Sequence, residues 1–405
     1  LGVESGEHIW VARSGPQYSF SNAFRVAPDG SEAQPLPQHR RYYSVAQDGS
    51  ALVPNPSFNV PGAVKLLPDG SYDASYQPVW DPQYGMAVFL PDQSILELGT
   101  YAMRRLSPGG RPLFDYQAAL PEPGTNHLEV TMVNQLWVLN ERGIAVDFDE
   151  RLLASLTLYY RTTDFTFRTN QGLFRFNLDG RMDRTFASPF GVPDRSGRQG
   201  LVLKVIPLFD GKILVGGLVR FADGLWQMGL ARLDRHGRLD DSLPSSVTAH
   251  FPLGAFPDGR LLVAEMHPDA PNVIKLLQPD GSEDASYAQV ILDRLQVYQS
   301  TAERSGHILF VGDLKPVGHP TAGGLFRLLA EVQRRMSSID PRPGGGLRLR
   351  WTAPVNEPHT LQSSTDLRVW TTVLTTNGAS PYFQLDLPPA GDAPAIFYRL
   401  APAPP

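Results

Sequence analysis

Short apolar runs that follow turns recur along most of the chain. The steps between them are roughly 30 to 48 residues, a spacing found in repeats that each form one small sheet. The runs are His8–Val11, Ala51–Val53, Ser94–Leu96, Gln135–Val138, Phe165–Phe167, Ile213–Val215, Leu261–Val263 and Ile308–Phe310. The pattern therefore predicts an all-β fold of repeated, propeller-like blades.

A second apolar strand follows most of these runs and ends in a turn closed by glycine, which accepts a positive φ at no steric cost. These segments are Phe24–Gly30, Val64–Gly70, Met103–Gly110, Phe174–Gly180, Ala231–Gly237 and Ile274–Gly281. An Asp-x-Ser/Thr-aromatic return follows several of the turns, at Tyr72–Tyr76, Met182–Phe186 and Glu283–Tyr287, with a variant at Leu239–Leu243. Helical periodicity is nearly absent, and its best candidate is Leu325–Met336.

These residues resemble the delta-60 repeat, a β-propeller repeat of bacterial extracellular proteins, most closely over Leu201–Leu243. The resemblance implies a closed radial array of blades over residues 1–338 and carries no catalytic residues. We favour eight blades. The chain has seven blades if the irregular pair of repeats around Asn134–Phe186 forms a single blade.

The pattern changes after Ile339–Gly346, a Pro/Gly-rich stretch that we interpret as a linker. Five short strands over residues 347–405 predict a small C-terminal β-sandwich, beginning with the alternating run Leu347–Trp351. This segment resembles a compact C-terminal module of secreted proteins of verrucomicrobial and planctomycete type, through Thr360–Leu367 with Trp370 and the closing Phe397–Leu400. The resemblance implies export and gives no function for the module.

Composition restricts the partners of the chain. The net charge is −5 with no basic run, which disfavours nucleic acid and anionic membranes as partners. There is no cysteine, and no apolar stretch is long enough to span a bilayer. The chain starts at Leu1 without Met, which suggests a leader that was removed. The resemblance of the C-terminal module to modules of exported proteins implies that the protein is extracellular or on the cell surface.

Basic residues recur just before the glycine turns. Arg25, Lys65, Arg105, Arg175 and Arg232 lie five residues before their glycine, and Lys275 lies six before Gly281. One interpretation is an ion pair in each blade with an acid of the turn or return, such as Asp73, Asp183, Asp240 or Asp284. The other is a ring of cations facing a channel or an anionic glycan. We favour ion pairs because the acids recur in step with the bases.

Aspartates of the turns could be read as calcium ligands, and Asp147 and Asp149 come closest to a ligand spacing. No D-x-D-x-D-G loop is present, and turn chemistry accounts for the Asp-Gly pairs. The nine histidines form no zinc motif, and there is no nucleophile elbow, dinucleotide fingerprint or P-loop. We therefore predict no metal and no cofactor.

Two groups of residues remain as candidates for function. Glu265 and Asp313 end apolar runs, and a glycosidase or lyase could use such carboxylates if the runs line the propeller axis. Trp80, Trp226, Tyr42 and Tyr43 lie in loop-like segments, where they could stack on sugars or pack between blades.

The favoured function is an extracellular or cell-surface binding or scaffold protein without catalysis, with a glycan or protein partner. The alternatives are a polysaccharide-active enzyme using Glu265 and Asp313, or a passive spacer. The sequence does not indicate an oligomeric state.

Overall fold

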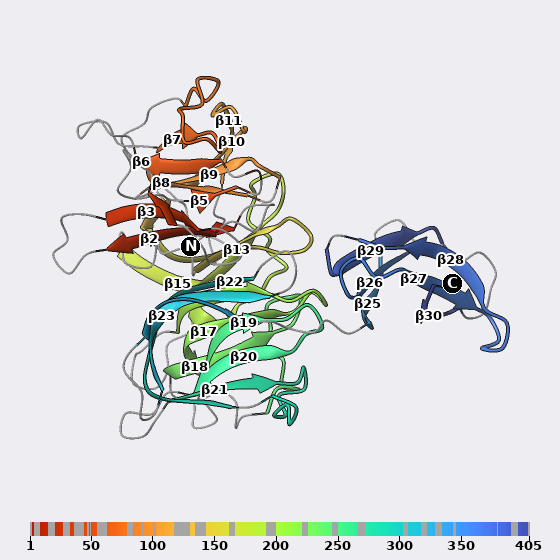
Figure 1. Cartoon of the computed structure of the whole chain (residues 1–405). Helices are drawn as coiled ribbons and strands as arrows, with labels where there is room; N and C mark the ends of the chain where they lie inside the picture. Colours follow the sequence, from red (N-terminus) through yellow and green to blue (C-terminus); the bar gives the residue numbers. More distant parts are fainter. Residues whose placement is uncertain are drawn as a thin grey trace. The chain divides into compact units, whose positions relative to one another are not determined.

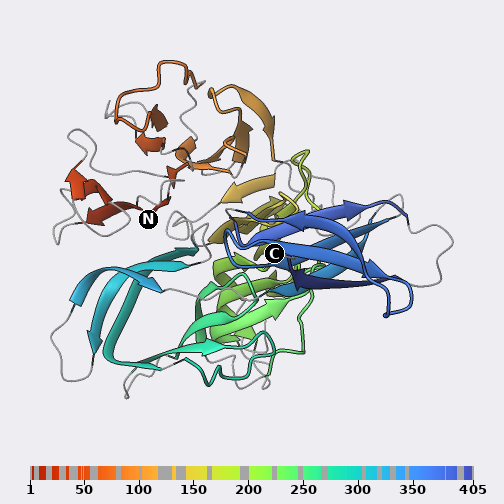
Figure 2. The ribbon, with the colours of Figure 1, turned by 45° about the vertical axis from the view of Figure 1, so that its right-hand side comes forward.

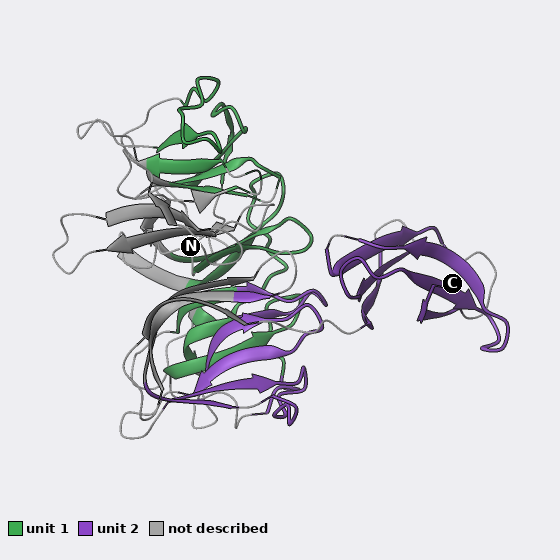
Figure 3. Ribbon diagram, in the orientation of Figure 1, with its two compact units in different colours: residues 1–205, 215–240 green, residues 206–214, 241–405 purple. Residues whose placement is uncertain are grey.

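The structure is a computed structural model of the whole chain. It describes residues 2–3, 9–14, 21–26, 33–35, 44–46, 48, 50–54, 63–78, 84–90, 92–99, 103–116, 130–133, 143–161, 167–191, 200–220, 226–244, 250–265, 272–287, 289–302, 307–316, 322–328, 334–342, 346–378, 380–389 and 396–403. The chain forms two compact units, residues 1–205 with 215–240 and residues 206–214 with 241–405 (Figure 3).

The first four sheets along the chain are small, antiparallel and part of the first unit, as expected for repeated blades (Figure 1). The first sheet contains β1 (Gly2–Val3), β2 (Ile9–Ser14), β3 (Ser21–Val26) and β4 (Ala33–Pro35). The second contains β5 (Ser44–Val45), β6 (Ala51–Pro54) and β7 (Ala63–Leu66). The third has the order β11-β10-β9-β8, with β8 (Tyr84–Phe89), β9 (Ile95–Gly99), β10 (Met103–Leu106) and β11 (Pro112–Asp115).

The fourth sheet contains the irregular repeats. Its strands are β12 (Val130–Val133), β13 (Ile144–Val146), β14 (Leu152–Arg161) and β15 (Phe167–Phe176). The long strand β14 pairs with β15 along its whole length and with β12 and β13 on its other side, so one sheet spans both repeats. The predicted strand Gln135–Val138 lies outside the described residues. Of Phe165–Phe167, only Phe167 is described, and it begins β15.

A further sheet, β16-β17-β18, contains the segment in which the repeat pattern is clearest. Its strands are β16 (Leu201–Pro207), β17 (Ile213–Arg220) and β18 (Trp226–Leu233). A 3₁₀ turn, η2 (Pro189–Gly191), precedes this sheet in the chain.

The second unit contains a six-stranded sheet in simple chain order. Its strands are β19 (His250–Ala255), β20 (Leu261–Glu265), β21 (Asn272–Leu277), β22 (Val290–Ala302), β23 (Ile308–Pro316) and β24 (Ala322–Leu328). Figure 2 shows β22 and β23 as long, bent strands.

The described residues of Leu325–Met336, the best candidate for a helix in an otherwise non-helical pattern, are not helical. Leu325–Leu328 ends β24, which pairs in register with β23, and Arg335 and Met336 begin the next strand, β25. The apolar spacing is short enough to fit either structure, and the neighbouring strand β23 decides in favour of a strand.

Several of the apolar runs lie in interior strands of their sheets. β6, β9, β17 and β20 each have a partner on both sides, because β5, β8, β16 and β19 precede them in hairpins. The run that includes Phe167 differs, because β15 pairs only with β14 among the described strands.

Two three-stranded sheets form the C-terminal part of the chain. One has the order β25-β26-β29, with β25 (Arg335–Pro341), β26 (Leu347–Thr352) and β29 (Tyr382–Leu387). The other has the order β28-β27-β30, with β27 (His359–Ser364), β28 (Thr371–Thr376) and β30 (Phe397–Pro402). One cluster joins their apolar side chains around the buried residues Leu349, Trp351 and Leu361.

The segment predicted as a linker, 339–346, takes part in this arrangement. Residues 339–341 pair with β26, and the Arg342 N–H donates to the Gly346 carbonyl at 3.2 Å. Glycine fits here because φ is +85° and a Cβ would lie 2.3 Å from the Leu387 carbonyl oxygen. The Pro/Gly composition therefore marks a tight hairpin, and the strand that precedes it was missed.

Apolar clusters connect neighbouring sheets within each unit. Leu52 and Ala63 of the second sheet pack with Ile95 and Leu106 of the third. A larger cluster joins the third and fourth sheets through Leu96, Leu152, Phe176 and neighbouring residues. In the second unit, Leu262 and Ile308 belong to one cluster of the six-stranded sheet. A sheet that is apolar on both faces requires a neighbour on each side, which is the physical reason for the repetition.

Candidate functional site

The glycine turns of the repeat share one geometry. In the example after β7, the Gly70 N–H donates to the Leu67 carbonyl at 2.9 Å, and the Leu67 N–H donates to the Ser71 carbonyl at 2.8 Å. Gly70 has a φ of +84°, as a type I turn followed by a left-handed residue requires. The Asp69 carboxylate accepts from the Ser71 N–H at 2.9 Å and so closes the turn.

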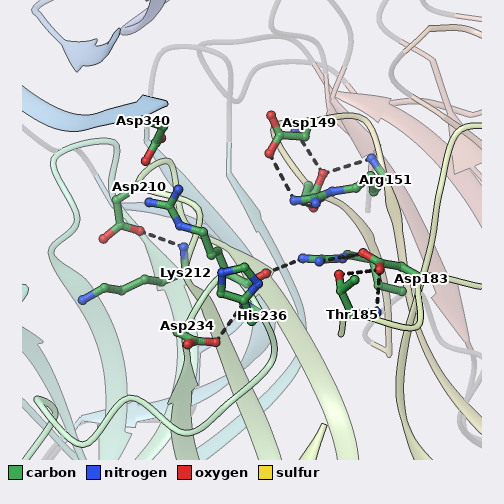
Figure 4. A network of polar contacts seen from close by, with 12 residues as sticks. Asp149, Arg151, Asp183, Thr185, Asp210, Lys212, Asp234, His236 and Asp340 are labelled. Carbon is green, nitrogen blue, oxygen red and sulfur yellow. Dashed lines mark hydrogen bonds and ion pairs between the residues drawn. The ribbon is translucent and has the colours of Figure 1, made fainter. Parts of the chain in front are cut away.

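The aspartates considered as calcium ligands make this same local bond. In each case the carboxylate accepts from the backbone N–H two residues later, as Asx turns do. These residues are Asp48, Asp69, Asp179, Asp210, Asp258 and Asp280. The carboxylates of Asp147 and Asp149 both contact the Arg151 guanidinium, at 2.8 and 3.1 Å (Figure 4). Within the described residues, no three acidic or histidine side chains gather to hold a metal ion.

The recurrent cations of three repeats form ion pairs with an acid eight residues later. The pairs are Lys65 with Asp73 at 3.1 Å, and Arg175 with Asp183 and Arg232 with Asp240, both at 2.7 Å. The backbone repeats this step, since each of these aspartates donates its N–H to the carbonyl of its cation's residue. The geometry of the return thus brings each pair together.

Lys275 follows the same rule with a shift of one residue. Its ammonium lies 2.8 Å from Glu283 and 2.7 Å from Glu265. The next residue of the return, Asp284, is contacted by Arg260 at 3.2 Å. Burial lowers the pKa of Lys275, but the hydrogen bonds to Glu265 and Glu283 outweigh it and raise that pKa above its ordinary value.

Arg105 departs from the rule because Leu113 stands eight residues later. Its guanidinium contacts the Asp92 carboxylate and donates to the Ser94 hydroxyl at 2.8 Å. Asp92 and Arg105 line a shallow pocket with Tyr116 and Glu150, which has room for about one water molecule. Of Arg25, the structure describes only its backbone pairing, with Trp10 on one side and Gln34 on the other.

The return of one repeat also contacts the turn of the next. The Arg175 guanidinium donates to the Arg235 carbonyl and lies 4.6 Å above the Phe186 ring. That ring covers Gly237, where an added Cβ would come within 2.8 Å of it. The Ala187 N–H donates to the His236 carbonyl at 2.7 Å, and Figure 4 shows this region with Asp183 and Thr185 beside it. We call this arrangement of ring, cation and glycine the interblade latch.

Related contacts occur at two other junctions of the first unit. Tyr76 packs against Gly110, and the Gln77 N–H donates to the Gly109 carbonyl at 2.9 Å. Phe114 packs against Gly180. The aromatic residue of the return therefore serves the contact between sheets, a role that the sequence pattern showed only as a recurring residue type.

A buried ion pair lies beside Tyr76. Arg104 and Glu97, opposite each other on β10 and β9, are 2.6 Å apart and almost fully buried. The Tyr76 hydroxyl is buried and has no hydrogen-bond partner among the described residues. Burial raises the pKa of Tyr76, and the negative charge of Glu97 raises it further.

Glu265 ends β20 inside a charged cluster. Its carboxylate lies between the Lys275 ammonium, at 2.7 Å, and His250 Nε2, at 3.8 Å. Asp313 lies on β23 opposite Gln296, whereas Glu265 is in register with Ile291 through Val273. On β22, the two partner residues Ile291 and Gln296 are five residues apart, about 17 Å along a strand. In the backbone register of the sheet, Glu265 and Asp313 are therefore not neighbours.

Of the four candidate aromatic residues, only Trp226 belongs to the described part of the chain. Trp226 is 2% exposed, and its ring packs 5.8 Å from that of Phe190, as the packing alternative describes. Trp80, Tyr42 and Tyr43 lie outside the described residues.

Residues 210–243 match one protein-family model. Its description is "Domain of unknown function (DUF5122) beta-propeller". The match covers the segment with the clearest repeat and the latch glycine Gly237. The repeat in this segment is thus of a β-propeller type. No curated protein matches the chain.

Several solved structures are similar at low identity. Prolyl oligopeptidase B from Galerina marginata shares 9% identity at a TM-score of 0.46, over 86% of this chain and 54% of that one. Dipeptidyl peptidase 4 from Porphyromonas gingivalis shares 10% at 0.44, over 88% of this chain and 64% of that one. Oligogalacturonate lyase from Vibrio parahaemolyticus shares 8% at 0.44, over 78% and 84%. The chain thus spans less than two thirds of the two peptidases.

In the described part of the chain, no helix has the length and apolarity needed to cross a membrane.

Proposed function

We propose that the chain is an extracellular or cell-surface binding or scaffold protein, built as a β-propeller with a C-terminal β-sandwich. Seven blades are supported by the single sheet formed by β12–β15. The shared core around Trp351 supports a sandwich of the last two sheets.

The observation that carries a non-catalytic role is the use of the repeated polar residues. The described cations at the repeat position and the aspartates of the turns bind one another or the backbone. Polar groups that bind one another or the backbone stabilise the blades, and they are not available to act on a substrate. Binding would then fall to surfaces that vary between blades, with a glycan or a protein as the partner.

The alternative is a polysaccharide-active hydrolase or lyase. It is favoured by the cluster at Glu265, where a carboxylate, an ammonium and an imidazole lie together. Because Asp313 is displaced along β22, this alternative requires another acid or base beside Glu265.

A panel of polysaccharides assayed for binding and for cleavage distinguishes the two functions. We expect binding without product release, and binding that persists in Glu265→Gln. Cleavage by the wild type that Glu265→Gln abolishes, while Asp179→Asn leaves it intact, would establish the enzyme instead.

A further inference from the structure

The turn between β27 and β28 exposes large apolar side chains. Leu367 is 56% exposed and Val369 is 70% exposed, the largest fraction among the large apolar residues described. Phe397, which is in register with Ser364 at the start of this turn, is 39% exposed. We call residues 364–370 with Phe397 and Arg399 the apolar tip. Contiguous exposed apolar residues of this kind mark interaction surfaces.

Hydrogen bonds hold the tip in this form. The Asp366 carboxylate accepts from the N–H groups of Arg368 and Val369, at 2.8 and 2.9 Å, and from the Ser364 hydroxyl at 3.0 Å. Leu367 has a φ of +61°, a region that non-glycine residues rarely adopt. The backbone therefore displays Leu367 in a strained conformation, although a glycine or asparagine would fit the turn better.

Positive charge accompanies the apolar side chains. Arg368 is exposed, and its guanidinium has no partner among the described residues. The Arg399 guanidinium lies 4.2 Å above the Trp370 ring and donates to the Gln362 side chain at 2.8 Å. The acid of the turn, Asp366, is bound by backbone N–H groups, and both Arg368 and Arg399 are exposed.

We propose that the apolar tip is a peripheral membrane-binding site for an anionic lipid surface. Leu367 and Val369 would enter the apolar layer, while Arg368 and Arg399 would meet the lipid phosphates. Trp370 would lie at the interface, where tryptophan is favoured. Charge complementarity at the tip supports a negative surface.

A sugar fits these observations less well. Sugar rings stack on open aromatic faces, and Arg399 covers a face of Trp370, while the most exposed side chains are aliphatic. The net charge of −5 disfavoured anionic membranes for the chain as a whole. Screening limits that argument, because charges beyond about 8 Å contribute little at physiological salt, so the local charge of the tip decides. The inference does not depend on the proposed function of the propeller.

Co-sedimentation of the full chain with lipid vesicles tests the proposal. The probe is vesicles of phosphatidylcholine mixed with phosphatidylglycerol, compared with phosphatidylcholine alone. We expect binding to the mixed vesicles that weakens as salt is raised. Leu367→Asn should reduce the affinity about tenfold, and Arg368→Gln about fivefold on the anionic vesicles only. Leu178→Asn, which changes a 50% exposed leucine in another turn, is the matched control and should bind as the wild type does.

Loss of folding cannot explain the expected result, because asparagine tolerates the positive φ of position 367 and should leave the melting temperature unchanged or raised. The proposal is overturned if the wild type does not sediment with the vesicles, or if Leu367→Asn binds as tightly as the wild type. It is also overturned if Leu367→Asn changes the oligomeric state in analytical ultracentrifugation without changing vesicle binding, since the tip would then contact a second copy.

Discussion

The interblade latch predicts that an alanine at position 237 is harmful for two separable reasons. Gly237 has a φ of +83°, where a side chain costs about 1–2 kcal/mol. An added Cβ would also lie 2.8 to 3.0 Å from three atoms of the Phe186 ring, and crowding of that kind costs about 1–3 kcal/mol. We therefore expect Gly237→Ala to lower the free energy of unfolding by about 2–5 kcal/mol.

A double-mutant cycle with Phe186→Ala separates the two contributions. Phe186→Ala alone is destabilising, because it removes the ring from beneath Arg175 and from Gly237. In that background the crowding is absent, so Gly237→Ala should cost only the backbone contribution of about 1–2 kcal/mol. The two changes should thus be less harmful together than their sum, by about 1–3 kcal/mol.

Gly259→Ala is the matched control for the cycle. Its φ is +88°, but the nearest atom to an added Cβ is Cγ of Pro279 at 3.3 Å. It should cost about 1–2 kcal/mol whether residue 186 is Phe or Ala. Equilibrium unfolding in urea, followed by tryptophan fluorescence, gives the required differences. The reasoning is refuted if Gly237→Ala costs the same in both backgrounds, or no more than Gly259→Ala.

Three further changes test other parts of the structure. Glu150→Gly should raise the free energy of unfolding by about 0.5–1 kcal/mol in the same assay, because Glu150 has a φ of +62° at the turn position where Gly70, Gly180 and Gly237 stand in other repeats. Tyr76→Phe should leave stability unchanged or raise it by about 1 kcal/mol, since it removes a buried hydroxyl without a described partner; a clear loss would show that the hydroxyl is bonded. Burial raises the pKa of Asp183, but hydrogen bonds from Thr185 and Arg175 outweigh burial and lower that pKa below its ordinary value. The stability that Asp183 contributes is therefore lost as pH falls below about 4. Asp183→Asn should therefore make the decline of the melting temperature between pH 4 and pH 2 less steep than it is in the wild type.

Local chemistry explains how much of the fold the sequence predicts. Turn glycines and the alternation of apolar residues act over fewer than ten residues, so the hairpins β6–β7, β9–β10 and β20–β21 lie where the pattern places them. The strand before each hairpin was missed, although an Asp-Gly turn such as Asp210–Gly211 requires a strand on both sides. The apolar run Leu201–Pro207 was the available signal.

Partners chosen by tertiary structure could not be predicted in the same way. Arg105 has the spacing of the other cations, yet it contacts Asp92, which precedes it by thirteen residues across a hairpin. The Pro/Gly stretch at 339–346 suggested a linker, because composition indicates the stiffness of a chain segment and not its strand pairing. In the structure, β25 pairs with β26. For Glu265, sequence position marked a strand end but could not show the ammonium of Lys275 beside it.

The recurring residues of this chain are best understood as requirements of the junctions between sheets. Gly110 and Gly237 meet a second requirement besides their positive φ, because an aromatic ring of the preceding repeat covers each of them. Where a junction changes, its residues change together: Phe114 covers Gly180, Leu113 replaces the returning acid, and Arg105 turns to Asp92. The recurring positions therefore indicate the contacts between neighbouring blades. A ligand site should be sought outside these recurring positions, as at the apolar tip of the C-terminal sheets.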